Sequence, residues 1–122
     1  MKRPKNGFSI IEVLMILIVI GILASIMIPR FADSKEKTYI AQMTSDLRSL
    51  ATYEDQYAAE NGGGYFAGTA SMTAPLHGFH TSEHVTIVVS TFAAPTASWR
   101  AVARHSLTSR NCDITNGVVS CS

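Results

Sequence analysis

The sequence predicts an α+β protein in which one long N-terminal helix packs on a small antiparallel β-sheet of three or four strands. Three patterns carry this prediction: an uncharged apolar run at 13–28, apolar residues at helical spacing as far as 60, and a period of two beyond 85. The 122 residues suit one domain, whose first part faces lipid and whose second part faces water.

The apolar run is long enough to cross a membrane. No charged residue occurs from Val13 to Ile28, and residues 8–28 would span about 32 Å as a helix. A cleavable secretory signal would end in a small-x-small site, but the candidate at 22–24, Ile-Leu-Ala, begins with a large residue. We therefore expect the segment to be retained as an anchor.

The charges on either side of this run predict its orientation. Lys2, Arg3 and Lys5 precede it and a polar body follows, so the positive-inside rule places the N-terminus in the cytoplasm and the bulk outside. The net charge of +1 argues against a general nucleic-acid binder.

Glu12 is a carboxylate at the start of the apolar segment. An ionised carboxylate inside hydrocarbon costs roughly 2 to 4 kcal/mol, so a neutralising partner is expected. If the chain is cut after Gly7, the new ammonium group of Phe8 lies four residues, one helical turn, before Glu12. A partner on another molecule would serve equally well.

In Gly7, Phe8 and Glu12 the chain resembles the type IV prepilins, whose processing site is a glycine followed by phenylalanine, with glutamate at the fifth mature position. The resemblance covers residues 1 to about 30. It implies cleavage after Gly7 by prepilin peptidase and N-methylation of Phe8. It also implies that Glu12 docks against the N-terminal amine of a neighbouring subunit and so sets the register of assembly.

The resemblance further implies where the protein resides. A single-pass precursor in the bacterial inner membrane contacts lipid until an assembly platform stacks identical or homologous pilin subunits into a homo-oligomeric helical filament, a fimbrium on the cell surface. The expected segments are a cleaved leader (1–7), a transmembrane and filament-core helix (8–29), an amphipathic second half of the helix (30–60), a connector loop (61–84) and an antiparallel sheet with a C-terminal disulfide hairpin (85–122).

Gly21 and Pro29 interrupt an otherwise strong helix. Glycine costs about 1 kcal/mol relative to alanine, and proline removes a backbone hydrogen bond. Family precedent implies that the helix between them loses order in a filament and lets the fibre stretch. The alternative is that both residues are simply common in membrane helices.

Beyond Pro29 the pattern becomes that of an amphipathic helix, which ends at the stop signal 61–64, Asn-Gly-Gly-Gly. The helix is therefore expected from about 8 to 60. Polar residues, Glu54 among them, are placed between the members of an apolar stripe that must pack on another element. The stripe consists of Ile40, Met43, Leu47, Leu50, Tyr53 and Tyr57.

Residues 85–90 and 99–104 alternate between apolar and polar side chains and predict two antiparallel strands, with Pro95 between them. Asn116-Gly117 is the strongest two-residue hairpin signal. In its register Cys112 faces Cys121 at a non-hydrogen-bonded position, where a cross-strand disulfide fits. Such a bond would contribute roughly 2.5 to 3 kcal/mol. Free or intermolecular thiols are the alternative.

No catalytic constellation occurs in the sequence, so we expect neither an enzyme nor a cofactor. His77, His80 and His84 with Glu83 form the one cluster that resembles metal ligands. Gly78 argues against the helix that would bring the histidines to one face. We expect a solvated or partly packed connector and no metal, with a weak metal site as the alternative.

Arg100 and Arg104 share a strand face, and Arg110 follows. Such a basic strip could touch DNA phosphates if the chain were a DNA-uptake (competence) minor pilin. A solvated strand face is the simpler interpretation.

The favoured function is that of a type IV pilus subunit, whose activity is assembly. One alternative is a pseudopilin of a type II secretion apparatus. Major pseudopilins tend to have an acidic calcium loop near the C-terminus, whereas here only Asp113 is acidic after Glu83, and the pair Cys112 and Cys121 favours a pilin. Another alternative is a monomeric membrane-tethered binding or catalytic domain, which would leave Glu12 unpaired.

Overall fold

The computed structural model describes residues 7–92 and 97–122. Most of the expected leader and Pro95, expected between two strands, lie outside the described residues. The chain forms two compact units, Met1–Lys35 and Glu36–Ser122.

The helix α1 (Ile10–Glu60) is continuous over 51 residues and agrees closely with the predicted range. It begins where the carbonyl of Ser9 accepts hydrogen bonds from the backbone N–H groups of Glu12 (3.0 Å) and Val13 (3.2 Å). The acidic Glu12 in this first turn is favourable next to the positive end of the helix dipole. The helix passes through Pro29 without ending.

The glycine-rich sequence after Glu60 ends α1, as predicted. The backbone N–H of Gly63 donates to the carbonyl of Ala58 at 2.7 Å, and Nδ2 of Asn61 donates to the carbonyl of Tyr57 at 3.0 Å. Gly62 and Gly63 have φ angles of 66° and 90°, a region that side chains disfavour. These contacts satisfy carbonyl groups that the last turn would otherwise leave unpaired.

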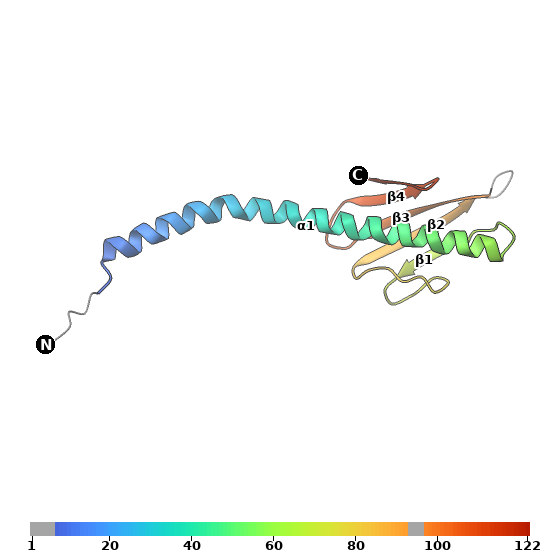
Figure 1. Cartoon of the computed structure of the whole chain (residues 1–122), viewed down its shortest axis with the longest axis horizontal. Coiled ribbons are helices and arrows are strands. Elements are labelled where there is room, and N and C mark those ends of the chain that lie inside the picture. Colours follow the sequence, from blue (N-terminus) through green and yellow to red (C-terminus); the bar gives the residue numbers. More distant parts are fainter. Residues whose placement is uncertain (1–6, 93–96) are drawn as a thin grey trace. The chain divides into compact units, whose positions relative to one another are not determined.

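Five strands form one antiparallel sheet in the order β1-β2-β3-β4-β5, so each strand pairs with the next one in the chain (Figure 1). The strands are β1 (Gly68–Ser71), β2 (Val85–Phe92), β3 (Ser98–His105), β4 (Asn111–Thr115) and β5 (Val118–Cys121). In β2 the buried Val85, Ile87 and Val89 alternate with exposed residues, which confirms the predicted period of two.

The predicted count of three or four strands was wrong, because the expected connector loop 61–84 contains the edge strand β1. This strand has only four residues, Gly-Thr-Ala-Ser, and so shows no alternating apolar pattern. Its pairing with β2, in which Gly68 faces Val89 and Ser71 faces Thr86, is a tertiary property.

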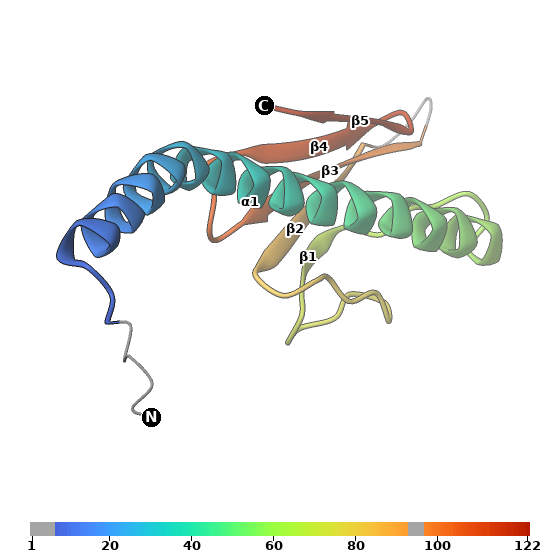
Figure 2. The same ribbon diagram turned by 60° about the vertical axis from the view of Figure 1, so that its left-hand side comes forward.

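The second half of α1 crosses one face of the sheet and supplies one layer of the core (Figure 2). Met43, Leu47 and Leu50 of the predicted stripe are fully buried against side chains of the sheet. Tyr53 lies at the margin of the stripe, with its ring 5.5 Å from that of Phe79. Each fully buried side chain of this kind contributes about 1.5 to 3 kcal/mol to folding.

Glu54 is buried in this layer, so the prediction that it is one of the polar residues outside the apolar stripe was wrong. Its exposure is 0%, because it follows Leu47 and Leu50 by seven and four residues and so shares their helix face. Its Oε2 accepts the backbone N–H of Phe66 at 3.1 Å, whereas Oε1 has no hydrogen-bond partner among the described residues. Burial raises the pKa of Glu54 to about 7; the hydrogen bond from Phe66 opposes this rise, and the charge of Asp55 adds to it.

β4 and β5 form the predicted hairpin in the predicted register, with Cys112 facing Cys121. A disulfide joins the two residues, whose Cα atoms are 4.0 Å apart. The turn residues Asn116 and Gly117 have φ angles of 52° and 78°, as a type I′ turn requires. In the second unit (Glu36–Ser122), which we call the head, the C-terminal hairpin is therefore closed by a covalent bond as well as by the sheet.

Candidate assembly site

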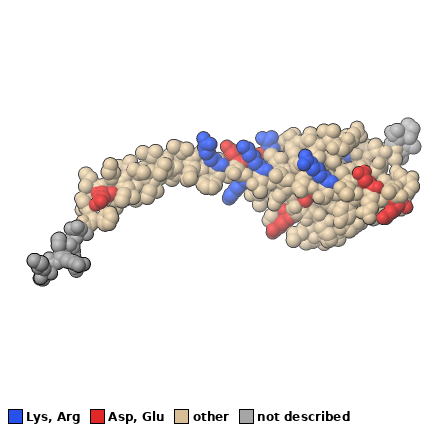
Figure 3. All heavy atoms as spheres, in the orientation of Figure 1, with Lys and Arg blue, Asp and Glu red and all other residues tan. Residues whose placement is uncertain are grey.

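The first unit exposes its apolar side chains. Every described residue from 7 to 35 is exposed, and Ile10, for example, is 81% exposed. An 18-residue window of this segment has a mean hydropathy of 2.9, so by length and composition the helix could cross a membrane. Figure 3 shows the segment as a surface with few charges, apart from an acidic spot near its beginning. Lipid or protein must cover such a surface in the cell.

Glu12 lies on an apolar face of this helix. Together with Met15, Ile16, Val19 and Ile20 it lines a shallow groove along α1. No ion pair joins its carboxylate to any of the described residues. The counter-charge expected for Glu12 is therefore not supplied by residues 7–92 or 97–122.

Gly7 and Phe8 precede α1 in exposed, non-helical backbone. A Cβ added to Gly7 would meet no atom within 4 Å, and Phe8 is 75% exposed. Nothing in the described chain therefore requires a glycine at position 7. The resemblance to prepilins implies another reason for this glycine, namely that an enzyme which cuts the peptide bond between Gly7 and Phe8 requires it.

Gly21 and Pro29 both lie within the continuous helix. A Cβ at Gly21 would meet no atom within 4 Å. Pro29 has no N–H group to donate to the carbonyl of Ser25, and the hydroxyl of Ser25 itself donates to the carbonyl of Ile22 at 2.7 Å. Softening of the helix between Gly21 and Pro29 stays a prediction.

In the second unit, polar contacts as well as the apolar stripe attach α1 to the sheet and its connecting loops. The carboxylate of the buried Asp46 accepts two hydrogen bonds from Ser82, one from the backbone N–H at 2.8 Å and one from the hydroxyl at 2.9 Å. Near the start of the unit, Arg110 Nε donates to Glu36 Oε1 at 2.9 Å. These contacts hold α1 in one rotation about its axis and in one position along that axis.

His105 forms a third attachment point. Its ring is buried and stacks on Tyr39 with 4.3 Å between ring centroids. Nδ1 accepts the backbone N–H of Leu107 at 3.2 Å, so Nε2 carries the proton and donates to Gln42 Oε1 at 3.2 Å. Burial lowers the pKa of His105, and the nearby His84 lowers it further. The neutral ring is therefore the form that this site requires.

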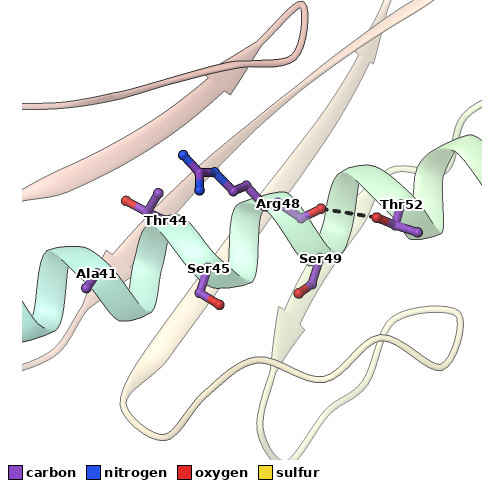
Figure 4. A pocket seen from close by; sticks show the side chains of 6 residues that line it. All are labelled: Ala41, Thr44, Ser45, Arg48, Ser49 and Thr52. Atoms are coloured by element: carbon purple, nitrogen blue, oxygen red, sulfur yellow. Dashed lines mark hydrogen bonds between the residues drawn. The ribbon is translucent and has the colours of Figure 1, made fainter.

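The outward face of the same helix half carries small side chains around one arginine (Figure 4). Arg48 is exposed, and its carbonyl accepts a hydrogen bond from the hydroxyl of Thr52 at 3.4 Å. Small side chains allow another helix to approach closely. The residues of this face are Ala41, Thr44, Ser45, Arg48, Ser49 and Thr52.

The histidines of the expected connector have separate surroundings. His77 lies against the rings of Tyr57 and Phe66, with centroid distances of 4.9 and 4.8 Å. His84 Nε2 lies 3.5 Å from Glu83 Oε1. Among the described residues no group of three or more His, Cys, Asp or Glu side chains is placed to hold a metal ion.

Two arginines of the expected basic strip are engaged in ion pairs. Arg100 Nη2 lies 3.2 Å from Asp113 Oδ2, and Arg110 Nε lies 2.9 Å from Glu36 Oε1. Their charge is therefore partly neutralised within the head. This pairing weakens the case for a strip that contacts DNA phosphates.

Asp46, Glu54 and His105 were not predicted from the sequence as attachment points. Helical spacing alone contained a signal for Glu54, because it falls in step with Leu47 and Leu50. Asp46 carries the same signal, because it is three residues after Met43 and four before Leu50, whereas His105 and the partners of both residues are distant in sequence from the stripe.

The N-terminal segment matches a family model described as the prokaryotic N-terminal methylation motif, over residues 2–28. The match includes Gly7, Phe8 and Glu12, the residues that carry the resemblance to type IV prepilins. The chain thus has the N-terminal motif of type IV pilin-like proteins. These are structural proteins and do not form a family of enzymes.

The particular relatives are type II secretion proteins. The chain is similar to the type II secretion system core protein G of Aeromonas hydrophila (35% identity over 60 residues), Dickeya chrysanthemi (31% over 61) and Klebsiella pneumoniae (32% over 59). The matches cover 49%, 50% and 48% of this chain and 42%, 40% and 42% of those relatives. The matched region therefore spans about two fifths of the length of these relatives. No solved structure gives a significant match.

The predicted resemblance to the type IV pilin-like class is confirmed by the motif and by this homology. A type IV pilus subunit was the favoured prediction from the sequence, and a type II secretion pseudopilin was an alternative. The relatives support that alternative better than the favoured interpretation.

Proposed function

We propose that the chain is a structural subunit of a pilin-like filament that belongs to a type II secretion system. The observation that carries this proposal is the exposed apolar helix of the first unit, which begins with the unpaired Glu12 and lies within the methylation motif. The relatives named for type II secretion favour this apparatus over a surface pilus. The proposed activity is assembly, without an enzymatic reaction.

The proposed precursor crosses the inner membrane once, with its N-terminus in the cytoplasm. Lipid covers the apolar face until prepilin peptidase cuts after Gly7 and Phe8 is N-methylated. The assembly platform then transfers the subunit into the filament, where identical or homologous subunits replace lipid around α1. Burial by neighbours removes the same apolar surface from water that the membrane removed before.

Glu12 gives this transfer its register. A carboxylate among apolar helices is stable only next to a counter-charge, and the amine of a processed Phe8 supplies one. A subunit placed one turn too high or too low would leave both charges unpaired. Electrostatic pairing therefore selects one axial position from many apolar contacts of similar strength.

The test compares Glu12→Ala with Glu83→Gln, which removes an exposed carboxylate from the head. Both variants are expressed with the assembly proteins, and the filament fraction is measured by sedimentation and immunoblotting. Glu12→Ala is expected to be processed and to stay in the membrane, with at least tenfold less filament. Glu83→Gln is expected to assemble like the wild type. Normal filament yield from Glu12→Ala would contradict the proposed role.

A change at Gly7 tests processing separately. The bulky variant Gly7→Leu is expected to retain the first seven residues, because the peptidase must accommodate position 7 next to the bond that it cuts. N-terminal sequencing of the membrane fraction measures this directly. A Gly7→Leu protein that starts at Phe8 would show that the proposed site is wrong.

A surface type IV pilus is the second candidate, favoured by the disulfide hairpin at Cys112 and Cys121, a feature that suits an exposed extracellular head. Deleting the gene separates the two candidates. Loss of protein secretion without loss of surface fibres supports the secretion apparatus. Loss of fibres, seen with an antibody against the head, with normal secretion supports the surface pilus.

A further inference from the structure

The head contains a cavity that the proposed assembly function does not use. It has a volume of about 260 Å³ and lies where α1, the segment after it, the start of β3 and the β4–β5 turn meet. The side chains that matter for its chemistry are Asp55 of α1, Tyr65 of the following segment, Trp99 of β3 and Asn116 of the turn. Asp55 and Asn116 are exposed, so a ligand can reach the cavity from solvent.

Two aromatic rings form walls of this cavity. The centroids of Tyr65 and Trp99 are 6.5 Å apart, with an angle of 50° between the ring planes. Both side chains are half-buried, and Trp99 packs against the core. Pairing of Trp99 with Thr91 of β2 also holds its backbone. The walls are therefore preorganised, and their faces carry the partial negative charge of an aromatic π-system.

The surroundings of Asp55 are electrostatically negative, which favours the binding of a positive charge. No Lys, Arg or His forms an ion pair with Asp55 within the described parts of the chain. The last turn of α1 contains the acidic Glu60 and no basic residue. The carbonyl end of a helix adds further partial negative charge.

We propose that this cavity binds an organic cation, a guanidinium or alkylammonium group, against the inclined rings of Tyr65 and Trp99 with its charge paired to Asp55. A carboxylate next to aromatic faces is the combination that attracts such groups, because the ion pair and the cation–π contacts act on the same charge. The carbonyl of the Asn116 side chain can accept a hydrogen bond from an N–H of the ligand. Two sources can supply the cation, a free small molecule and an arginine or lysine of a neighbouring subunit, and the experiment below distinguishes them.

Trp99 is the only tryptophan of the chain, so its fluorescence reports on this cavity. The full chain in detergent micelles is titrated at low salt with Nα-acetyl-arginine amide, and the neutral isostere Nα-acetyl-citrulline amide serves as the control ligand. The arginine compound is expected to give a saturable change and to shift the NMR signal of the Trp99 indole N–H. The citrulline compound is expected to bind at least tenfold more weakly.

Two variants locate the effect. Asp55→Asn is expected to weaken binding of the arginine compound at least fivefold. The matched control Glu60→Gln removes one negative charge from the same helix end without altering the cavity lining, and it is expected to change binding less than twofold. Equal binding of both ligands, or an equal effect of both variants, would overturn the proposal. So would the absence of saturable binding.

A further arm of the experiment identifies the source of the cation. If a neighbouring subunit supplies it, Trp99 in assembled filaments stops responding to the arginine compound, and the response returns after disassembly in detergent. If a free molecule supplies it, filaments and monomers respond alike. The micelle titration tests the cavity even if the chain does not form filaments, so failure of this proposal is distinct from failure of the proposed function.

Discussion

Leu17 and Leu47 lie in the same helix but in opposite surroundings. Leu17 is 58% exposed in the first unit, whereas Leu47 is fully buried between α1 and the sheet in the second. The head thus completes its own core, whereas the side chains of the first unit stay exposed; in the proposed function, lipid or other subunits cover them. The comparison shows that one helix can serve folding at one end and association at the other.

Truncation of Leu47 should lower the free energy of unfolding of the head far more than truncation of Leu17, and this difference is the largest effect that we expect. Leu47→Ala removes buried methyl groups and leaves a cavity, so it is expected to lower the free energy of unfolding of the head by about 2 to 5 kcal/mol. Leu17→Ala is expected to change it by less than about 0.5 kcal/mol, because Leu17 is exposed in the first unit and is not a member of the head core. Urea unfolding in micelles, followed by Trp99 fluorescence, measures both. Similar losses would contradict the separation of roles.

The disulfide should give the next largest effect. The double variant Cys112→Ser, Cys121→Ser is expected to lower the free energy of unfolding by about 2 to 3 kcal/mol, because the unfolded chain loses a closed loop. Reduction of the wild-type protein should give a similar loss. Reduction of the double variant should change nothing, which controls for other effects of the reductant.

Glu54 should make the stability of the head depend on pH. Its pKa is raised to about 7, so the folded state binds a proton that the unfolded state loses near pH 4.5. The stabilising contribution is therefore complete below pH 4.5 and is lost as the pH rises towards and through 7. The expected loss is on the order of 1 to 3 kcal/mol.

Glu54→Gln is the matched control, because its amide oxygen can still accept the Phe66 N–H group. The difference in unfolding free energy between wild type and Glu54→Gln is compared at pH 4.5, 5.5 and 7.5. We expect the variant to gain on the wild type as the pH rises. A difference that is constant with pH would mean that Glu54 does not titrate in this range.

Gly21→Ala should have the smallest effect. Alanine favours helix by about 1 kcal/mol over glycine, and the structure leaves room for its methyl group. Amide hydrogen exchange around position 21 is expected to slow in micelles, while the unfolding of the head stays the same. Unchanged exchange would indicate that Gly21 does not soften the helix.

The features predicted correctly from the sequence are local ones. The helix has a long periodic pattern and a glycine stop signal, and the Asn116-Gly117 turn determines which residues face each other, including Cys112 and Cys121. β1 could not be predicted, because its four small residues become a strand only by pairing with β2. Local patterns do not reveal partners that are distant in sequence.

The candidate sites divide in the same way. Gly7, Phe8 and Glu12 are recognisable because they belong to a short contiguous motif. The cavity of Tyr65 and Trp99 and the attachment of Asp46 to Ser82 involve residues from different elements. Helical spacing would have predicted that Glu54 is buried, but the residue was placed among the polar positions because it is charged.

We propose that processing exposes an amine that neutralises Glu12 during assembly. The most direct measurement is the intact mass, together with N-terminal sequencing, of protein isolated from the assembled fraction. We expect a chain that begins with N-methylated Phe8 and contains the Cys112–Cys121 disulfide. An assembled chain that still carries its first seven residues would contradict it.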